Sequence, residues 1–465
     1  MTTPAECQEF LARHPGIEAV QLFITDPSGV PRGKTASVEE LARLYAHGRP
    51  VAGSILGLDI TGTDVESTGL VWETGDADLI CRPVPGTLAL APWLARPTAQ
   101  VMLSMYQPSG EPAAADPRHV LARAVERLRR AGLRAVLAVE LEFYVLDERS
   151  KEPAGSLARG GGRIDAYGLA RLEELSGFFD EVYAAARAQG IPAETLMSEY
   201  APGQFEITLR HRDDALRAVD EAVLLKRLLR GVAARYGLLV TFMAKPFVEL
   251  AGSGMHLHVS LAREPAATTS AEPASAEKAA VAQADNLFAA TDPAGSPLLR
   301  QALGGLKQTM AESLLVFAPN GNSYRRFRSQ SYAPVAANWG VNNRSVSLRV
   351  PSGPPASRHI EHRIAGADAN TYLAAAVVLS GVLRGIESTA DPGPPVQGNG
   401  YLGATRRELP QTWHEAIERA DTSEFLTEAL GEPFKRIFLA IKRQECDRFS
   451  AEVTELDRSW YLRSS

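Results

Sequence analysis

The sequence has few cysteines, and they lie far apart. Cys7, Cys81 and Cys446 are its three cysteines in 465 residues, so it contains no CxxC pair. Disulfide frameworks and zinc knuckles need paired cysteines, and this spacing argues against both. We therefore expect a protein of a reducing compartment, with the cytoplasm as the default location.

Long apolar runs and an excess of basic residues are also missing. No stretch approaches the roughly 20 apolar residues that span a bilayer. The start, MTTPAECQEF, has neither the basic nor the apolar region of a signal peptide. The formal net charge is −6, which argues against nucleic acid or an anionic membrane as a partner. With 45 % apolar and 22 % charged residues, the chain reads as an ordinary soluble globular protein.

The length of 465 residues predicts more than one hydrophobic core. The first hundred residues read as short strands and turns, with a hairpin whose first arm holds Val20, Leu22 and Ile24 and whose turn is 26–29. The tract QPSGEP at 107–112 resembles a linker. We expect one domain at 1–108 and a second at 109–465.

The larger part alternates strand-like and helix-like segments, which predicts an α+β or mixed α/β fold. One helix is expected after Asp116, a good N-cap followed by proline, and is expected to end at Gly132. Further helices are expected over 213–236 and 370–386. Residues 263–280, rich in Ala, Glu, Ser, Thr and Pro, are expected to form a surface loop.

Glutamates recur on the polar faces of apolar strands. Residues two apart on a strand share a face, so Glu140 and Glu142 lie side by side. Two carboxylates so close repel each other, and they need nearby cations or a proton on one of them to remain side by side. Glu199 precedes a Pro-Gly turn, and Glu206 lies opposite the apolar face of its strand. Each segment taken alone also fits a solvated strand.

Two histidines share a strand face in residues 252–260, GSGMHLHVS. His256, His258 and Ser260 point one way, and the preceding glycines allow backbone to approach a ligand closely. This spacing indicates a ligand or phosphate site. The alternative is a pair of core histidines bonded to backbone.

Arginines gather in three later segments, which contain Arg326, then Arg344 and Arg349, then Arg363 two residues after Glu361. Planar guanidinium groups suit carboxylates and phosphates. Oxygen ligands with an occasional imidazole suit Mg²⁺ or Mn²⁺ better than zinc. Arginines beside such a cluster indicate phosphoryl transfer, although no GxxxxGK[ST] loop is present. A metal-dependent hydrolase built on the His-x-His pair is an alternative.

The order of these segments resembles the glutamine synthetase family. That family has a Glu-x-Glu strand, a Glu…Gln-x-Glu segment, GSGMHxHxS, N-[SA]-Y-[KR]-R, NR-[ST]-x-S-x-R-[IVL]-P and R-x-I-E-x-R, in this order. The chain carries the corresponding residues at 140–142, 199–206, 252–260, 322–326, 343–351 and 358–363. The resemblance implies a small N-terminal β-grasp domain plus a large catalytic α/β domain. It also implies a homo-oligomeric double ring, a dodecamer, with active sites between adjacent subunits.

The resemblance assigns roles to single residues. Two divalent ions, Mg²⁺ or Mn²⁺, would be held in each site, one by Glu142, Glu199 and Glu206 and the other by Glu140, His256 and Glu361. The substrate glutamate would be bound by Gly252, His256, Arg326 and Arg363. ATP would be bound by His258, Ser260, Arg344 and Arg349. Arg344, Arg326 and Glu361 would act in catalysis, which joins the γ-carboxyl of glutamate to an amine through γ-glutamyl phosphate.

Two departures bear on the amine. Val51 stands where the family has an aspartate that binds ammonium, and Tyr332 replaces the flap glutamate. Without these carboxylates a larger amine fits better, packed on Val51 and Tyr332, so we expect a polyamine or small monoamine as substrate. The branch resembled is that of the γ-glutamylpolyamine synthetases. Alternatives are an ordinary glutamine synthetase using ammonium and a catalytically silent relative. In addition, His359 replaces an arginine near the nucleotide, and 406–410 lacks the usual adenylylation segment.

Overall fold

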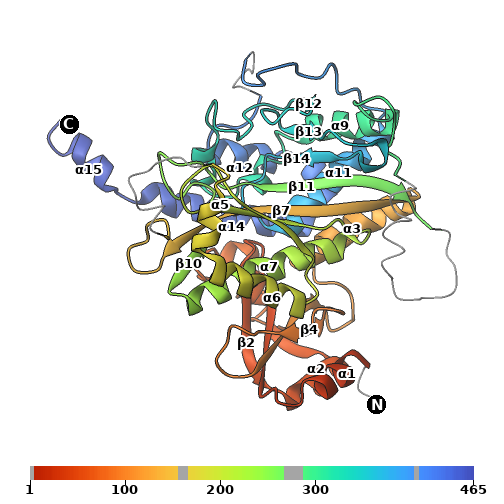
Figure 1. Ribbon diagram of the computed structural model, residues 1–465. Helices are drawn as coiled ribbons and strands as arrows, with labels where there is room; N and C mark the ends of the chain where they lie inside the picture. Colours follow the sequence, from red (N-terminus) through yellow and green to blue (C-terminus); the bar gives the residue numbers. More distant parts are fainter. Residues whose placement is uncertain (1–4, 156–165, 266–285, 403–407, 465) are drawn as a thin grey trace.

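The computed structural model describes residues 5–155, 166–265, 286–402 and 408–464 (Figure 1). Its N-terminal part holds a sheet with the strand order β2-β1-β6-β4-β3, and β5 pairs with β6. β1 and β6 run parallel, and the other pairs are antiparallel. The strands are β1 (Ala19–Thr25), β2 (Pro31–Ser37), β3 (Arg49–Ala52), β4 (Asp78–Pro83), β5 (Ala89–Leu90) and β6 (Thr98–Tyr106).

The predicted hairpin is confirmed as β1 and β2, which pair from Ala19 opposite Ser37 to Thr25 opposite Pro31. The expectation of only strands and turns in the first hundred residues was wrong, because α1 (Ala5–Arg13) and α2 (Glu39–His47) are helices. Each has only nine residues and two buried side chains, so its apolar pattern is short. The β-grasp assignment stays a prediction.

A larger mixed sheet carries the candidate site. In the described residues it has the strand order β12-β13-β14-β11-β7-β9-β8, and β10 pairs with β7. The long central strand β7 lies antiparallel between β11 and β9, and this register places Glu140 opposite His256 and Glu142 opposite Glu206. The strands are β7 (Leu133–Asp147), β8 (Ala193–Ser198), β9 (Gln204–Leu209), β10 (Leu238–Thr241), β11 (Met255–Arg263), β12 (Trp339–Val341), β13 (Leu348–Val350) and β14 (Ile360–His362).

The three predicted helices are confirmed as α3 (Pro117–Arg130), α7 (Ala215–Arg235) and α11 (Thr371–Glu387). The side chains of Asp116, Asp214 and Asn370 accept hydrogen bonds from backbone N–H groups of the first turn, as N-caps do. Helix α7 lies between the two sheets (Figure 1), where Arg227 donates to Gln100 of β6 at 2.7 Å.

The other described helices complete the fold. The α-helices are α5 (Leu169–Glu174), α6 (Ser176–Ala188), α9 (Pro297–Thr309), α10 (Leu314–Phe317), α12 (Trp413–Asp421), α13 (Glu424–Leu430), α14 (Glu432–Ala451) and α15 (Glu455–Tyr461). Helix α15, near the C-terminus, projects away from the rest of the molecule (Figure 1). Short 3₁₀ helices are η1 (Gly53–Leu56), η2 (Glu66–Thr68), η3 (Ser323–Arg326) and η4 (Pro355–Ser357). Within the described residues, no helix combines the length and the apolar character that a membrane crossing requires.

Buried apolar side chains form one large core around β7, α7 and α11 and a second core on the N-terminal sheet. The second core includes Ile437 and Ile441 of α14, so the far end of the chain helps to cover the first sheet. The division at 108/109 stays a prediction. Most of the loop predicted at 263–280 lies outside the described residues.

Candidate active site

Carboxylates from two strands and one turn converge on a cavity of about 390 Å³. We call it the acidic cavity. Glu140 and Glu142 come from β7, Glu206 from β9, and Glu199 from the turn after β8. The predicted residues that line it are Glu140, Glu142, Glu199, Glu206, Gly252, His256, Arg326, Tyr332, Arg344 and Arg363. The sheet register therefore gathers groups that lie more than 200 residues apart.

His256 lies in the middle of the carboxylates. Its Nδ1 is 2.5 Å from Glu140 Oε1 and 3.7 Å from Glu361 Oε1, and its Nε2 is 3.6 Å from Glu142 Oε1. The backbone N–H of Gly254 donates to Glu142 Oε2 at 2.8 Å. Glu140, Glu142 and His256 present ligand atoms within 4.8 Å of one another, so members of the two predicted ligand sets adjoin.

Burial and mutual repulsion govern the charge of this cluster. Burial, and then the charge of Glu142, raises the pKa of Glu199 to about 7. Burial, and then the charges of Glu140 and Glu142, raises the pKa of Glu206 to about 11. Carboxylates crowded in this way are fully ionised only when cations accompany them. The oxygen-rich donor set with one imidazole fits Mg²⁺ or Mn²⁺.

Glu361 of β14 lies beside the cluster but is paired with arginines. It accepts from Arg349 Nη1 at 2.7 Å and also pairs with Arg363. Burial would raise the pKa of Glu361, but the charge of Arg363, followed by that of His256, outweighs it and holds the pKa at about 2. The carboxylate is therefore ionised, and each of its oxygens retains a lone pair for a metal ion.

Arg326 and Gly252 form one wall of the acidic cavity. Arg326 is 5 % exposed and donates to the carbonyl of Ile364 at 2.8 Å, which fixes the guanidinium. A Cβ on Gly252 would lie 2.6 Å from the carbonyl oxygen of Ala244, so only glycine fits. The Nε2 of Gln204, a residue that sequence reasoning did not assign, donates to the Gly252 carbonyl at 3.0 Å.

Of the residues predicted to bind ATP, Arg344 lines the acidic cavity, and His258, Ser260 and Arg349 do not. His258 nevertheless joins the cluster, because its Nε2 lies 3.3 Å from Glu140 Oε2. Ser260 lies two residues further along β11 and is buried.

Sequence reasoning missed His211. It follows β9 and lies beside His258 and His359, with ring centroids 5.9 and 5.4 Å away. Burial, and then the neighbouring histidines, lowers the pKa of His211 to about 3, and burial lowers that of His359 to about 4. Both rings are therefore neutral at pH 7. No strand periodicity marks His211, because it lies beyond the end of its strand.

The two positions that depart from the family pattern lie in different places. Tyr332 lines the acidic cavity with its backbone in the left-handed region, at φ 57°. Tyr167, which sequence reasoning missed, lines it too, at φ 63°. Val51 belongs to β3 of the N-terminal sheet and does not line this cavity. A role for Val51 in binding the amine stays a prediction.

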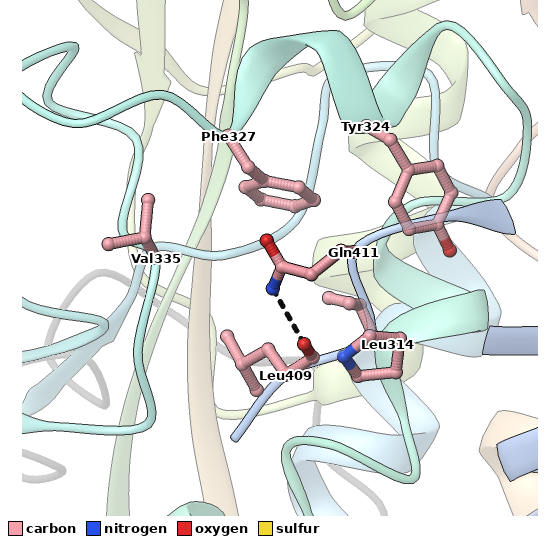
Figure 2. Close-up of a pocket in the computed structure, with 7 residues that line it drawn as sticks. Leu314, Tyr324, Phe327, Val335, Leu409 and Gln411 are labelled. Atoms are coloured by element: carbon pink, nitrogen blue, oxygen red, sulfur yellow. Dashed lines mark hydrogen bonds between the residues drawn. The ribbon is translucent and has the colours of Figure 1, made fainter. Parts of the chain in front are cut away.

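A second cavity, of about 280 Å³, lies between η3 and the segment before α12 (Figure 2). Its lining includes Leu314, Phe327 and Val335, and the Gln411 side chain donates to the Leu409 carbonyl at 2.7 Å. Among the residues that the structure describes, no carboxylate or cationic side chain lines it. The absence of an adenylylation segment at 406–410 stays a prediction, because 403–407 lie outside the described residues.

Comparisons with known proteins agree with this geometry. Residues 114–461 match the model of the glutamine synthetase catalytic domain. The chain is 36 % identical to the gamma-glutamylputrescine synthetase PuuA of Escherichia coli (strain K12), over 99 % of this chain and 95 % of that protein. It is 30 % identical to a glutamate–isopropylamine ligase of a Pseudomonas species, over 98 % and 97 %. A solved structure of GmaS with ADP superposes with a TM-score of 0.82 at 26 % identity, covering 99 % of this chain and all of that one. The chain belongs to the glutamine synthetase family.

Proposed function

We propose that the protein is an ATP-dependent ligase that joins the γ-carboxyl of glutamate to an organic amine, a polyamine or a small monoamine. The observation that carries this proposal is the composition of the acidic cavity. Carboxylates, an imidazole and arginines line one side, and Tyr332 lies where the family pattern has an acid. The names of two relatives, which specify putrescine and isopropylamine, support the choice of amine.

The charge of each residue indicates which ligand it would bind. Glu142, Glu199 and Glu206 would hold one divalent ion, and Glu140, His256 and Glu361 the other. When bound, these ions neutralise the phosphate oxygens of ATP and the carboxylate that approaches them. Arg326 and Arg363, beside Gly252, are suited to hold the substrate glutamate.

Arg344 is exposed and lines the acidic cavity, so it is free to approach the transferred phosphoryl group. Transfer of the γ-phosphoryl group from ATP to the γ-carboxylate of glutamate makes γ-glutamyl phosphate. The amine then attacks the carbonyl carbon and loses a proton. The bond between this carbon and the phosphate oxygen breaks, and inorganic phosphate leaves. His258, Ser260 and Arg349 would bind the nucleotide.

The alternatives differ in what the enzyme consumes. An ordinary glutamine synthetase would prefer ammonium, and a catalytically silent relative would not hydrolyse ATP in the presence of glutamate and amine. A metal-dependent hydrolase would need no ATP. The proposed metal-binding residues are all present and converge, which argues against a silent protein.

A homo-oligomeric double ring, a dodecamer with sites between adjacent subunits, is part of the proposal. It accounts for Val51, which lies on the N-terminal sheet and would complete the amine site of a neighbour.

The ligase activity is tested by measuring phosphate release by the purified protein with ATP, Mg²⁺ and glutamate. Putrescine, spermidine, isopropylamine and ethanolamine are each compared with ammonium. We expect at least one organic amine to give a higher kcat/KM than ammonium; faster turnover of ammonium than of every amine would refute the proposal.

A further inference from the structure

Three histidines, one on a strand and two next to the ends of other strands, meet beside Glu140 of the acidic cavity. We call His211, His258 and His359 the histidine cluster. His258 lies on β11, His211 follows β9, and His359 precedes β14. One ring nitrogen from each lies within 4.8 Å of the other two. None of the three belongs to the set of residues that we propose for the two divalent ions of the ligase reaction.

The hydrogen-bond partners fix which nitrogen of two rings carries the proton. His359 Nδ1 lies 2.7 Å from the carbonyl oxygen of Ser357, and a carbonyl only accepts, so Nδ1 is the donor. His258 Nε2 lies 3.3 Å from Glu140 Oε2, and an ionised carboxylate also only accepts. The nitrogens that remain to face each other are therefore His359 Nε2 and His258 Nδ1.

His258 Nδ1 and His359 Nε2 are 3.1 Å apart, a distance at which either a shared proton or a metal ion joins the two rings. Two imidazoles on one tetrahedral Zn²⁺, with Zn–N bonds of about 2.0–2.1 Å, place their nitrogens about 3.3–3.4 Å apart. The observed separation is slightly shorter, so a small rotation of one ring would bring both nitrogens to this spacing.

We propose that the histidine cluster binds a transition-metal ion of the Zn²⁺ class, separate from the two ions of the ligase reaction. Imidazole nitrogens favour Zn²⁺, Cu²⁺ and Ni²⁺, whereas Mg²⁺ favours oxygen. The bond from His359 to Ser357 and that from His258 to Glu140 are the outer contacts that orient metal-binding imidazoles.

The surroundings of the histidine cluster admit such an ion. One side of His211 packs against His258 and His359 and the residue keeps accessible surface on the other side, which provides an entry path. The nearest arginines, Arg349 and Arg363, are paired with Glu361, so their charges are partly balanced. Because we also propose His258 as an ATP contact, the transition metal and the nucleotide would compete for this side of the site.

The test is a binding experiment on the full-length protein without ATP, so it does not depend on ligase activity. Co²⁺, whose visible absorption reports nitrogen ligation, and Zn²⁺, followed by calorimetry, are titrated in a large excess of Mg²⁺. We expect one ion per chain. His211→Ala and His359→Ala should each weaken Zn²⁺ binding at least tenfold and remove the Co²⁺ band. His414→Ala serves as the matched control, because His414 is exposed on α12.

A second control separates this site from the carboxylates. Glu199→Gln alters the acidic cavity but not the histidine cluster, so it should leave the Co²⁺ band unchanged. Circular dichroism checks that the variants fold. The proposal is overturned if a proton alone bridges His258 and His359, in which case no Co²⁺ band appears. A band that persists in both His211→Ala and His359→Ala also overturns it.

Discussion

Glu206 shares the acidic cavity with three other glutamates, and its charge is therefore costly without metal. We predict that Glu206→Gln raises the free energy of unfolding of the metal-free protein by roughly 1–3 kcal/mol at pH 7, because a neutral amide avoids the cost of protonating the carboxylate on folding. The same change should abolish the stabilisation that Mg²⁺ gives, because one ligand is lost. Thermal unfolding with and without Mg²⁺ measures both effects. Glu111→Gln, on an exposed loop, is the control and should change neither.

The raised pKa values also predict how metal binding depends on pH. Between pH 7 and about 11, Glu206 is protonated in the metal-free protein, and below pH 7 Glu199 is protonated as well. A metal ion must displace these protons, so its apparent affinity falls as the pH falls, about tenfold per pH unit for each displaced proton. Mg²⁺ titration calorimetry at pH 8 and pH 6, in buffers of different ionisation enthalpy, counts the protons. Release of no more protons at pH 6 than at pH 8 would contradict this reasoning.

At the scale of elements, local sequence patterns predicted the helix starts and strand faces, which depend on residues close together in the chain. The N-cap Asp116 and the strand alternation around Glu140 and His256 were sufficient to place a helix and two polar strand faces. The register that sets His256 opposite Glu140 is a long-range property that local patterns did not predict, and only the family resemblance implied that the two residues meet at one metal ion. His211 and Tyr167 were missed because they lie outside the strands, where no periodicity operates.

The loop between η3 and β12 carries the predicted amine specificity. Tyr332 is 62 % exposed in this loop, so its ring can form an apolar wall for a substrate. We predict that Tyr332→Glu lowers kcat/KM for the preferred organic amine, relative to ammonium, by about 10–200-fold, the range typical of a lost apolar contact. The KM for glutamate should change little. Tyr332→Phe keeps the wall and the same backbone constraint, and it should retain the preference. If the ratio of kcat/KM for the organic amine to kcat/KM for ammonium is the same in both variants, Tyr332 does not select the amine.

A buried ion pair joins three helices behind the larger sheet. Arg118 of α3 contacts Asp220 of α7 through two bonds, at 2.9 and 3.0 Å, and Tyr372 of α11 donates to Asp220 at 2.7 Å. Asp220→Ala would leave the Arg118 charge buried without a partner, and we predict a loss of about 3–5 kcal/mol of stability. Asp213→Ala removes a more exposed partner, that of Arg134, and should cost about 0–1 kcal/mol. Urea denaturation of both variants compares them; equal losses would show that Asp220 does not hold the helices together.

At the scale of the whole molecule, the position of Val51 makes the assembly testable. Val51 lies on β3, in the N-terminal sheet, whereas the acidic cavity belongs to the larger sheet. If the cavity of one subunit is completed by the β3 strand of the next, Val51→Arg and Glu206→Gln damage opposite halves of each site. Homo-oligomers of either variant should then be inactive as amine ligases.

Mixing the two variants under conditions that dissociate and reassemble the ring should restore activity. With random exchange, about a quarter of the sites contain two undamaged halves, so about a quarter of the wild-type rate is expected. Sedimentation velocity confirms that both variants assemble, and circular dichroism confirms that Val51→Arg folds. A site built within one chain would always contain one damaged half, so mixtures would stay inactive. Phosphate release in mixed rings therefore decides whether neighbouring subunits share each active site.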